Sequence, residues 1–268
     1  MQLTIDGISF GVLDEGTGDA IVLLHGFPLA KESWDAQAAT LSLRARVIRI
    51  DLRGLGASAV TPGPYLMEAL ASDVAAILDA LAVERAVVVG HSLGGYVAFA
   101  FYRLFAERCL GLGIVCSRAT PDDVAQATAR EALAARAESE GMGPIVDAFV
   151  GRYFAPSIYA DRSDLVALAR EMSLRTDPRG AAAMLRGMAE RVSSEDLFDE
   201  IAVPVRVIAC AHDAFVDVDV MRSIAGGIRG SKLDIFPCGH LPLWELPDAT
   251  TASLAGLLDD VALGRASA

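Results

Sequence analysis

The chain has 268 residues, 53% of them hydrophobic, which is enough to bury a large core as one α/β unit with an insertion. Its formal net charge of -12 argues against nucleic-acid binding, because phosphate contacts need clustered Lys and Arg. Its mean hydropathy of +0.40 comes from Ala-rich segments and short Val/Ile runs, and no run approaches the ~20 apolar residues of a membrane span. We therefore expect a soluble protein with neither a nucleic-acid nor a membrane partner.

The N-terminus and the cysteines bear on where the protein works. Residues 1–6 contain neither a basic segment nor an apolar run, so we expect no secretion signal. The four cysteines have no Cys-x-x-Cys spacing, which favours small core side chains in a reducing compartment over disulfides or zinc ligands. The sequence thus predicts a cytoplasmic protein without a metal or other cofactor.

The first third of the chain alternates short apolar runs with amphipathic stretches. Two runs flank Asp6-Gly7, a strong hairpin signal, so the sheet is predicted to begin with antiparallel edge strands. Farther on, apolar residues recur at spacings of three and four and predict a helix with one buried face. The predicted elements are strands over 3–5, 8–13, 21–24 and 47–50 and helices over 33–42 and 66–81.

The segment 86–99 reads as a strand, a sharp turn and a helix. Its β-branched run 86–89 is typical of a strand buried on both faces of a parallel sheet, and the stretch after the turn has helical character. Ser92 lies at the turn, with glycines two residues before and two after it. This Gly-x-Ser-x-Gly pattern in its strand-to-helix context predicts a nucleophile elbow, whereas a Gly-rich turn with a capping serine leaves the second pair of glycines unexplained.

The pattern changes between residues 118 and 195. This stretch holds Ala-rich helical segments broken by Gly and Pro and no convincing strand, so we expect a helical cap there. Outside it, strands are predicted over 112–116, 205–210 and 233–236, with a helix over 218–225. The predicted fold is α/β: a mostly parallel sheet with helices on both faces, formed by 1–117 and 196–268, with the cap 118–195 inserted.

Three polar residues follow predicted strands, where functional residues of an open parallel sheet gather. They are Ser92, Asp213 and His240. A serine hydroxyl needs an imidazole to take its proton, and a carboxylate fixes the tautomer of that imidazole. The chain order Ser, Asp, His is the order of the α/β-hydrolase triad.

Other residues compete for two of these roles. His91 adjoins Ser92 in sequence, but consecutive residues at a sharp turn point apart, so it is not expected to be the base. His212 directly precedes the predicted acid and stays an alternative to His240. Asp217 and Asp219 stay alternatives to Asp213, although they look like carboxylates at a helix N-terminus.

A tetrahedral intermediate needs two hydrogen-bond donors for its oxygen. We assign the backbone N–H groups of Leu93, directly after the serine, and of Phe27, in the loop that follows strand 21–24. We place Pro28 among the substrate-contacting residues: it stiffens that loop and would hold its carbonyls close to Ser92, where they accept a hydrogen bond from peroxide, with a purely stiffening role as the alternative. Met184 and Met188 are candidates for an apolar substrate pocket, with ordinary packing between cap helices as the alternative.

Five features together resemble the α/β-hydrolase superfamily: HGFP at 25–28, DLRGLGAS at 51–58, GHSLGG at 90–95, Asp213, and Gly239-His240. They are similar to a compact bacterial branch of carboxylesterases, 3-oxoadipate enol-lactonase-like enzymes and cofactor-free haloperoxidase-like perhydrolases. The resemblance implies the hydrolase fold, the triad and the oxyanion hole assigned above. Serine rather than aspartate at 92 departs from the dehalogenase and epoxide-hydrolase branches, and Cys210-Ala211 stands where relatives often have glycine.

The predicted function is hydrolysis of a small-molecule ester or lactone through an acyl-enzyme on a Ser-His-Asp triad. Perhydrolysis on the same site is the first alternative. A ligand-binding receptor on a hydrolase scaffold is the second, and a complete triad argues against it. The sequence predicts neither the natural substrate nor the oligomeric state.

Overall fold

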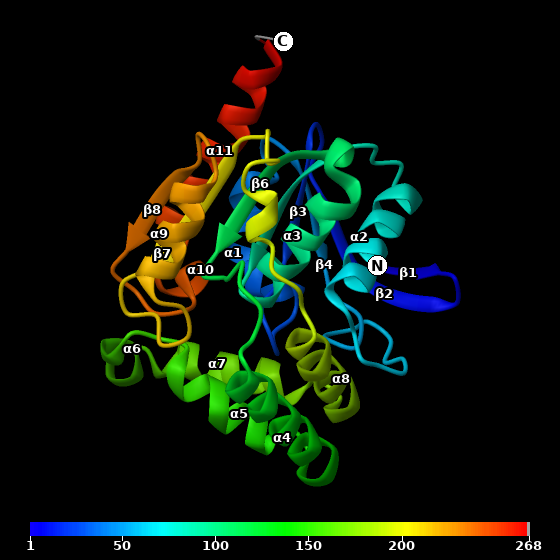
Figure 1. Cartoon of the computed structure of the whole chain (residues 1–268), viewed down its shortest axis with the longest axis vertical. Coiled ribbons are helices and arrows are strands. Elements are labelled where there is room, and N and C mark those ends of the chain that lie inside the picture. The colour runs from blue at the N-terminus through cyan, green and yellow to red at the C-terminus, as the bar shows by residue number, and fades with distance from the viewer. Residues whose placement is uncertain (267–268) are drawn as a thin grey trace.

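A single eight-stranded sheet runs through the centre of the protein, as the computed structural model of residues 1–266 shows (Figure 1). The strand order is β1-β2-β4-β3-β5-β6-β7-β8, and every pairing from β4 to β8 is parallel. The strands are β1 (Gln2–Ile5), β2 (Ile8–Glu15), β3 (Ala20–Leu24), β4 (Arg46–Ile50), β5 (Ala86–His91), β6 (Cys109–Val115), β7 (Val205–Cys210) and β8 (Lys232–Phe236).

The N-terminal hairpin is confirmed. β1 pairs antiparallel with β2 around Asp6 and Gly7, which have φ values of 49° and 80°. β2 then pairs antiparallel with β4 and joins the hairpin to the parallel strands. The positive φ angles at Asp6-Gly7 are those that a tight two-residue hairpin requires, which is why the dipeptide was informative in the sequence.

The register of the parallel strands brings their carboxyl ends to one edge. Leu24 of β3 pairs with Gly90 of β5, His91 pairs with Val115 of β6, and Cys210 of β7 pairs with Phe236 of β8. The loops that follow these strands therefore emerge side by side. This edge is where an open parallel sheet places its functional residues.

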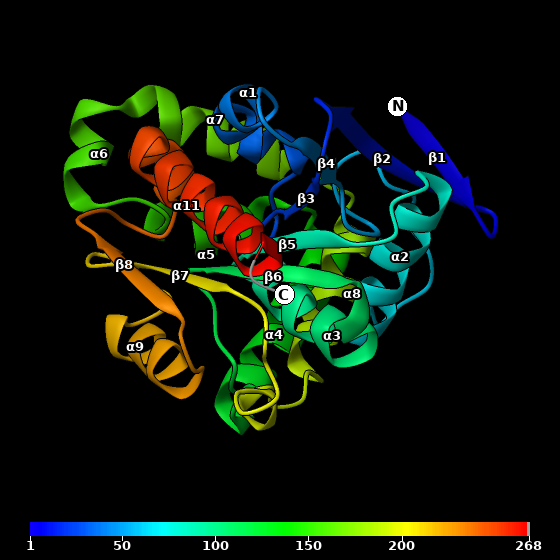
Figure 2. The ribbon, with the colours of Figure 1, turned by 90° about the horizontal axis from the view of Figure 1, so that it is seen from above.

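Helices cover both faces of the sheet, as the view from above shows (Figure 2). One face carries α1 and α11, and the other carries α2, α3 and α9. Their bounds are α1 (Asp35–Leu41), α2 (Met67–Ala80), α3 (Leu93–Phe105), α9 (Val218–Gly227) and α11 (Pro247–Ala266). None of the helices within residues 1–266 is long and apolar enough to cross a lipid bilayer.

Five helices between β6 and β7 lie below the carboxyl edge of the sheet in Figure 1. Residues 118–195, all of which the structure describes, contain no strand. Asp123 begins the first of these helices with a capping box, accepting a 2.7 Å hydrogen bond from the N–H of Gln126. The helices are α4 (Val124–Glu140), α5 (Gly143–Phe149), α6 (Pro156–Asp161), α7 (Ser163–Leu174) and α8 (Pro178–Ala189).

Most predicted elements match the structure to within one or two residues at each end, and the differences at β6 and α1 have physical reasons. β6 begins at Cys109, whereas the predicted strand begins at residue 112. The sequence pattern is weak in this region because it contains two glycines, Gly111 and Gly113, which are uncommon inside strands. Packing explains the second glycine, since a Cβ at Gly113 would lie 2.8 Å from Cγ2 of Val89. The helix predicted over 33–42 is a 3₁₀ turn, Lys31–Trp34, followed by α1.

Candidate active site

Ser92 lies at the corner between β5 and α3 with φ 51° and ψ -113°, a backbone conformation that residues other than glycine rarely adopt. The turn leaves no room around it: a Cβ on Gly90 would lie 2.0 Å from the carbonyl oxygen of Gly94, and one on Gly94 would lie 2.3 Å from that of Leu24. Two hydrogen bonds hold the corner, from the Ser92 N–H to the Val115 carbonyl (2.9 Å) and from the Ser117 hydroxyl to the Ser92 carbonyl (2.7 Å). The strain is therefore fixed by the surrounding fold.

Asp213 and His240 meet across the loops after β7 and β8. Nδ1 of His240 lies 2.7 Å from Oδ2 of Asp213, and both side chains are almost fully buried. Oδ1 of Asp213 accepts hydrogen bonds from the N–H groups of Phe215 (2.7 Å) and Val216 (3.0 Å). Burial by itself would raise the pKa of Asp213, but His240 and these donors outweigh it and hold the pKa below its usual range. The carboxylate is thus ionised and oriented toward the imidazole.

The other histidines occupy different positions. His91 is buried, and its Nε2–H donates a 2.8 Å hydrogen bond to the carbonyl oxygen of His240. Burial, together with the nearby His240 ring, lowers the pKa of His91 to about 3, so this ring is neutral. His25 is buried as well and accepts a 3.0 Å hydrogen bond from the N–H of Leu52, whereas His212 is exposed.

The rival carboxylates belong to helix α9. Asp217 is its N-cap and accepts a 2.8 Å hydrogen bond from the N–H of Asp219, as expected for a carboxylate at a helix N-terminus. Asp219 is exposed and forms an ion pair with Arg222 (2.7 Å). Of the three aspartates weighed in the sequence, the structure pairs Asp213 with a histidine.

The loop after β3 lies directly against the elbow. A Cβ on Gly26 would lie 2.5 Å from Nδ1 of His91 and 3.3 Å from Cβ of Ser92, so only glycine leaves room for this contact. Tyr153 holds the loop from the cap side, donating a 2.8 Å hydrogen bond to the Phe27 carbonyl. Within residues 1–266 the Phe27 N–H donates to no hydrogen bond, and the N–H of Leu93, at the start of α3, lacks an intrahelical acceptor.

A cavity of about 300 Å³ opens onto the serine and the histidine. Ser92, His240 and Phe27 line one side of it, and side chains from the cap, Met188 among them, line most of the remainder. Met184 does not line this cavity, because its side chain is fully enclosed one turn earlier on α8. The sequence-based assignment of Met184 to substrate contact is therefore corrected to packing within the cap.

Pro28 does not line the cavity either. It is buried, and its carbonyl accepts a hydrogen bond from the hydroxyl of Thr176 (3.3 Å). The neighbouring Phe27 carbonyl also accepts a hydrogen bond, from the hydroxyl of Tyr153. Both carbonyls thus face the cap, and the expected direct contact of Pro28 with substrate is corrected in the same way.

One group of possible metal ligands occurs within residues 1–266: Cys116, Asp213 and His240 offer atoms that lie within 4.8 Å of one another. Two of these atoms, Nδ1 of His240 and Oδ2 of Asp213, already form a hydrogen bond with each other. Burial raises the pKa of the Cys116 thiol to about 12, so the thiolate that a metal would need is disfavoured. The donor set therefore suits an acid–base pair better than a metal.

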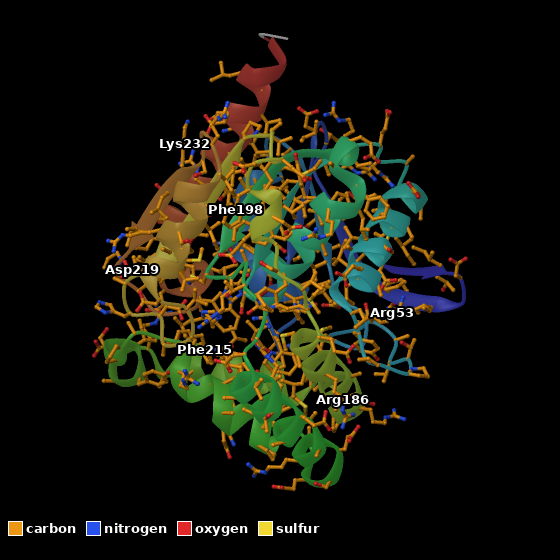
Figure 3. All side chains as sticks on the ribbon, viewed as in Figure 1. Arg53, Arg186, Phe198, Phe215, Asp219 and Lys232 are labelled. Atoms are coloured by element: carbon orange, nitrogen blue, oxygen red, sulfur yellow. The ribbon has the colours of Figure 1, made fainter. Side chains whose placement is uncertain are left out.

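The structure adds residues that the sequence did not single out. Glu245 links the cap to the loop that carries His240. Its carboxylate accepts hydrogen bonds from the N–H groups of Gly239 in that loop (2.9 Å) and of Ala155 in the cap (3.2 Å). Phe215 packs on His240, with ring centroids 4.8 Å apart, and lies between the sheet and the cap helices in Figure 3. Neither has a local sequence signal, since each depends on segments far apart along the chain.

The fold and the site together define an α/β hydrolase. A family model described as "alpha/beta hydrolase fold" matches residues 19–247. The chain therefore belongs to this family, as its motifs suggested, and is a hydrolase.

Its relatives place it in the esterase and enol-lactonase branch. A thermophilic esterase from Thermogutta terrifontis, solved with malate bound, is 36% identical, with a TM-score of 0.95 over 97% of this chain and 99% of that one. The enol-lactonase from Burkholderia xenovorans LB400 is 27% identical, with a TM-score of 0.91 over 97% of this chain and 100% of that one. Among curated proteins, 3-oxoadipate enol-lactonase 2 of Acinetobacter baylyi is 28% identical over 249 residues, 92% of each chain.

Proposed function

We propose that this protein hydrolyses small carboxylic esters or lactones through an acyl-enzyme on Ser92, with His240 as the general base and Asp213 as its partner. The observation that carries the proposal is the 2.7 Å pair of His240 Nδ1 and Asp213 Oδ2 beside a cavity that Ser92 and His240 both line. A metal ion or other cofactor has no part in this reaction as proposed.

The geometry supports a different role for each of the three residues. With Nδ1–H donated to the Asp213 carboxylate, the neutral imidazole carries its lone pair on Nε2 and can take the Ser92 proton. The serine oxygen then attacks the carbonyl carbon, and the imidazolium gives its proton to the leaving alcohol or enol oxygen. His240 then takes a proton from water, which attacks the acyl-enzyme, and returns that proton to the Ser92 oxygen as the bond to the acyl group breaks and the acid is released.

We assign the oxyanion hole to the N–H groups of Phe27 and Leu93. Both belong to segments fixed from several sides: Tyr153 holds the Phe27 peptide, and Leu93 begins the buried helix α3. The partial positive charge at the N-terminus of α3 adds to the field that a developing oxyanion meets. A preorganised pair of donors of this kind contributes ~3 to 4 kcal/mol per donor to transition-state stabilisation.

We also propose that residues 118–195 act as a cap domain that selects the substrate. Cap side chains form most of the cavity wall, and its volume of about 300 Å³ suits a small molecule. Met188, on this wall, supplies flexible apolar contact for an acyl or alcohol chain.

The alternatives have less support. Perhydrolysis would need a carbonyl that is directed toward peroxide beside Ser92, and the carbonyls of Phe27 and Pro28 are instead directed toward the cap hydroxyls that donate to them. A receptor would not need the pairing of His240 with Asp213.

Fluorophosphonate labelling with peptide mapping tests the proposal, together with turnover of p-nitrophenyl butyrate. We expect label on Ser92 and loss of nearly all turnover in Ser92→Ala, while the control Ser72→Ala, at an exposed site on α2, keeps it. Asp213→Asn is expected to lower kcat by ~10³- to 10⁴-fold, because the wrong imidazole tautomer becomes favoured. Undiminished turnover in Ser92→Ala, or label on another residue, would overturn the assignment.

A further inference from the structure

We propose that the substrate of this site is a monoester of a short dicarboxylic acid, with its free carboxylate at the end remote from the scissile bond. The inference rests on the proposed function and names its substrate class. It comes from the charged residues of the cavity wall.

The cavity is positively charged although the chain as a whole carries -12. Its charged lining residues are three arginines, Arg118, Arg130 and Arg152, and one aspartate, Asp122. That aspartate is already shared: Arg130 forms an ion pair with it, and Arg191 approaches it to 2.8 Å from outside the cavity. The single acidic group of the wall is thus more than neutralised by its own neighbours.

Arg118 and Arg152 form no ion pair with any carboxylate of the part of the chain that the structure describes. Instead each donates to a backbone carbonyl of the loop after Asp213, Arg118 to Phe215 and Arg152 to Ala214. The Arg152 guanidinium also lies over the Phe215 ring, 4.3 Å from its centroid. These contacts hold both guanidinium groups at the cavity wall and leave N–H donors on each of them unused.

The surroundings favour an anion of carboxylate type. Phe149, Leu133 and Leu185 line the same cavity, and these apolar walls reduce the screening of the half-buried Arg118 by water, whereas Arg152 is exposed to solvent. Guanidinium groups match the planar carboxylate with paired hydrogen bonds. A molecule with an ester at Ser92, a short methylene chain and a terminal carboxylate satisfies the nucleophile, the apolar wall and the arginines together.

Turnover of two esters with the same acyl length tests the inference: mono-p-nitrophenyl glutarate, which has the carboxylate, and p-nitrophenyl pentanoate, which lacks it. We expect kcat/KM to favour the glutarate ester by ~10-fold or more at low ionic strength, and the preference to shrink in high salt. Arg118→Gln and Arg152→Gln are each expected to reduce this ratio at least ~3-fold. The control Arg170→Gln, at an exposed arginine of α7 outside the cavity, leaves it unchanged.

Binding separates this inference from the proposed chemistry. In the Ser92→Ala protein, calorimetric titration is expected to show that monomethyl glutarate binds ~10-fold tighter than methyl pentanoate, and that adding Arg152→Gln removes most of the difference. A binding preference without turnover in the parent would refute the hydrolase and keep the carboxylate site. Turnover without any preference for the acidic ester or ligand, or a preference that persists in both arginine variants, would refute the carboxylate site and keep the hydrolase.

Discussion

Acidification is expected to destabilise the fold through His91, the histidine beside the nucleophile. Its ring is buried, and Nε2–H donates to the His240 carbonyl 2.8 Å away, while Nδ1 faces Gly26 without a hydrogen-bond partner within residues 1–266. A proton on Nδ1 would place an unsolvated charge next to the His240 ring, whose centroid is 4.9 Å from that of His91. The folded protein therefore resists protonation of this ring.

The size of the effect follows from the difference in pKa. In the folded protein the pKa of His91 is about 3, because of burial and then of His240, whereas an unfolded histidine titrates near ~6.5. Below pH ~6.5 the unfolded chain binds a proton that the folded protein does not. The free energy of unfolding therefore decreases as the pH is lowered, until about pH 3. Each pH unit inside this window costs ~1.4 kcal/mol, so at pH ~4.5 His91 removes about 3 kcal/mol relative to neutral pH.

Urea unfolding of the parent and of His91→Gln at pH ~7 and ~4.5 measures this contribution. The amide of glutamine does not titrate, so the loss of stability between the two pH values is expected to be about 3 kcal/mol smaller in His91→Gln than in the parent. His212→Gln, at an exposed histidine, is the control and should lose as much as the parent. Equal losses in the parent and in His91→Gln would refute the reasoning.

Three further predictions concern the site. Gly26→Ala should lower kcat/KM by ~100-fold, because its Cβ would displace the Phe27 loop from Ser92, and Gly143→Ala, with open space around it, should match the parent; equal activity of both variants would contradict this. Met188→Ala should change the dependence of kcat/KM on acyl chain length, while Met184→Ala should lower only stability in thermal unfolding; the opposite pattern would return Met184 to the pocket. Glu245→Ala should lower the free energy of unfolding by ~2 kcal/mol or more and should lower kcat, because it leaves two N–H groups unpaired beside His240; Glu245→Gln, which keeps an acceptor, should lose less, and equal losses would argue against these hydrogen bonds.

Much of the fold was determined by local patterns in the sequence. Continuous β-branched runs marked the parallel strands, the three-and-four spacing marked α2, and Asp6-Gly7 marked the hairpin. Each signal depends on residues only a few positions apart, through side-chain periodicity or turn conformation. Such patterns can therefore be recognised in a short stretch of sequence, without information on how the rest of the chain folds.

The residues of the candidate triad were predictable for a related reason. Parallel strands bring their carboxyl ends to one edge, so Ser92, Asp213 and His240 could be expected to meet there once each had been placed after a strand. The pairing of His240 with Asp213 rather than with Asp217 was not fixed by spacing alone. It depends on Asp217 being used as the cap of α9.

Only the tertiary structure decided what surrounds the site. Arg118 and Arg152 are ordinary arginines in the sequence, and they become features of one cavity because the insertion folds back over the loop after Asp213. Met184 and Met188 are one helical turn apart on α8, yet packing encloses the first and leaves the second on the cavity wall. Contacts of this kind join segments tens of residues apart, and the free energy that fixes them comes from close packing between elements, which no local pattern of residues records.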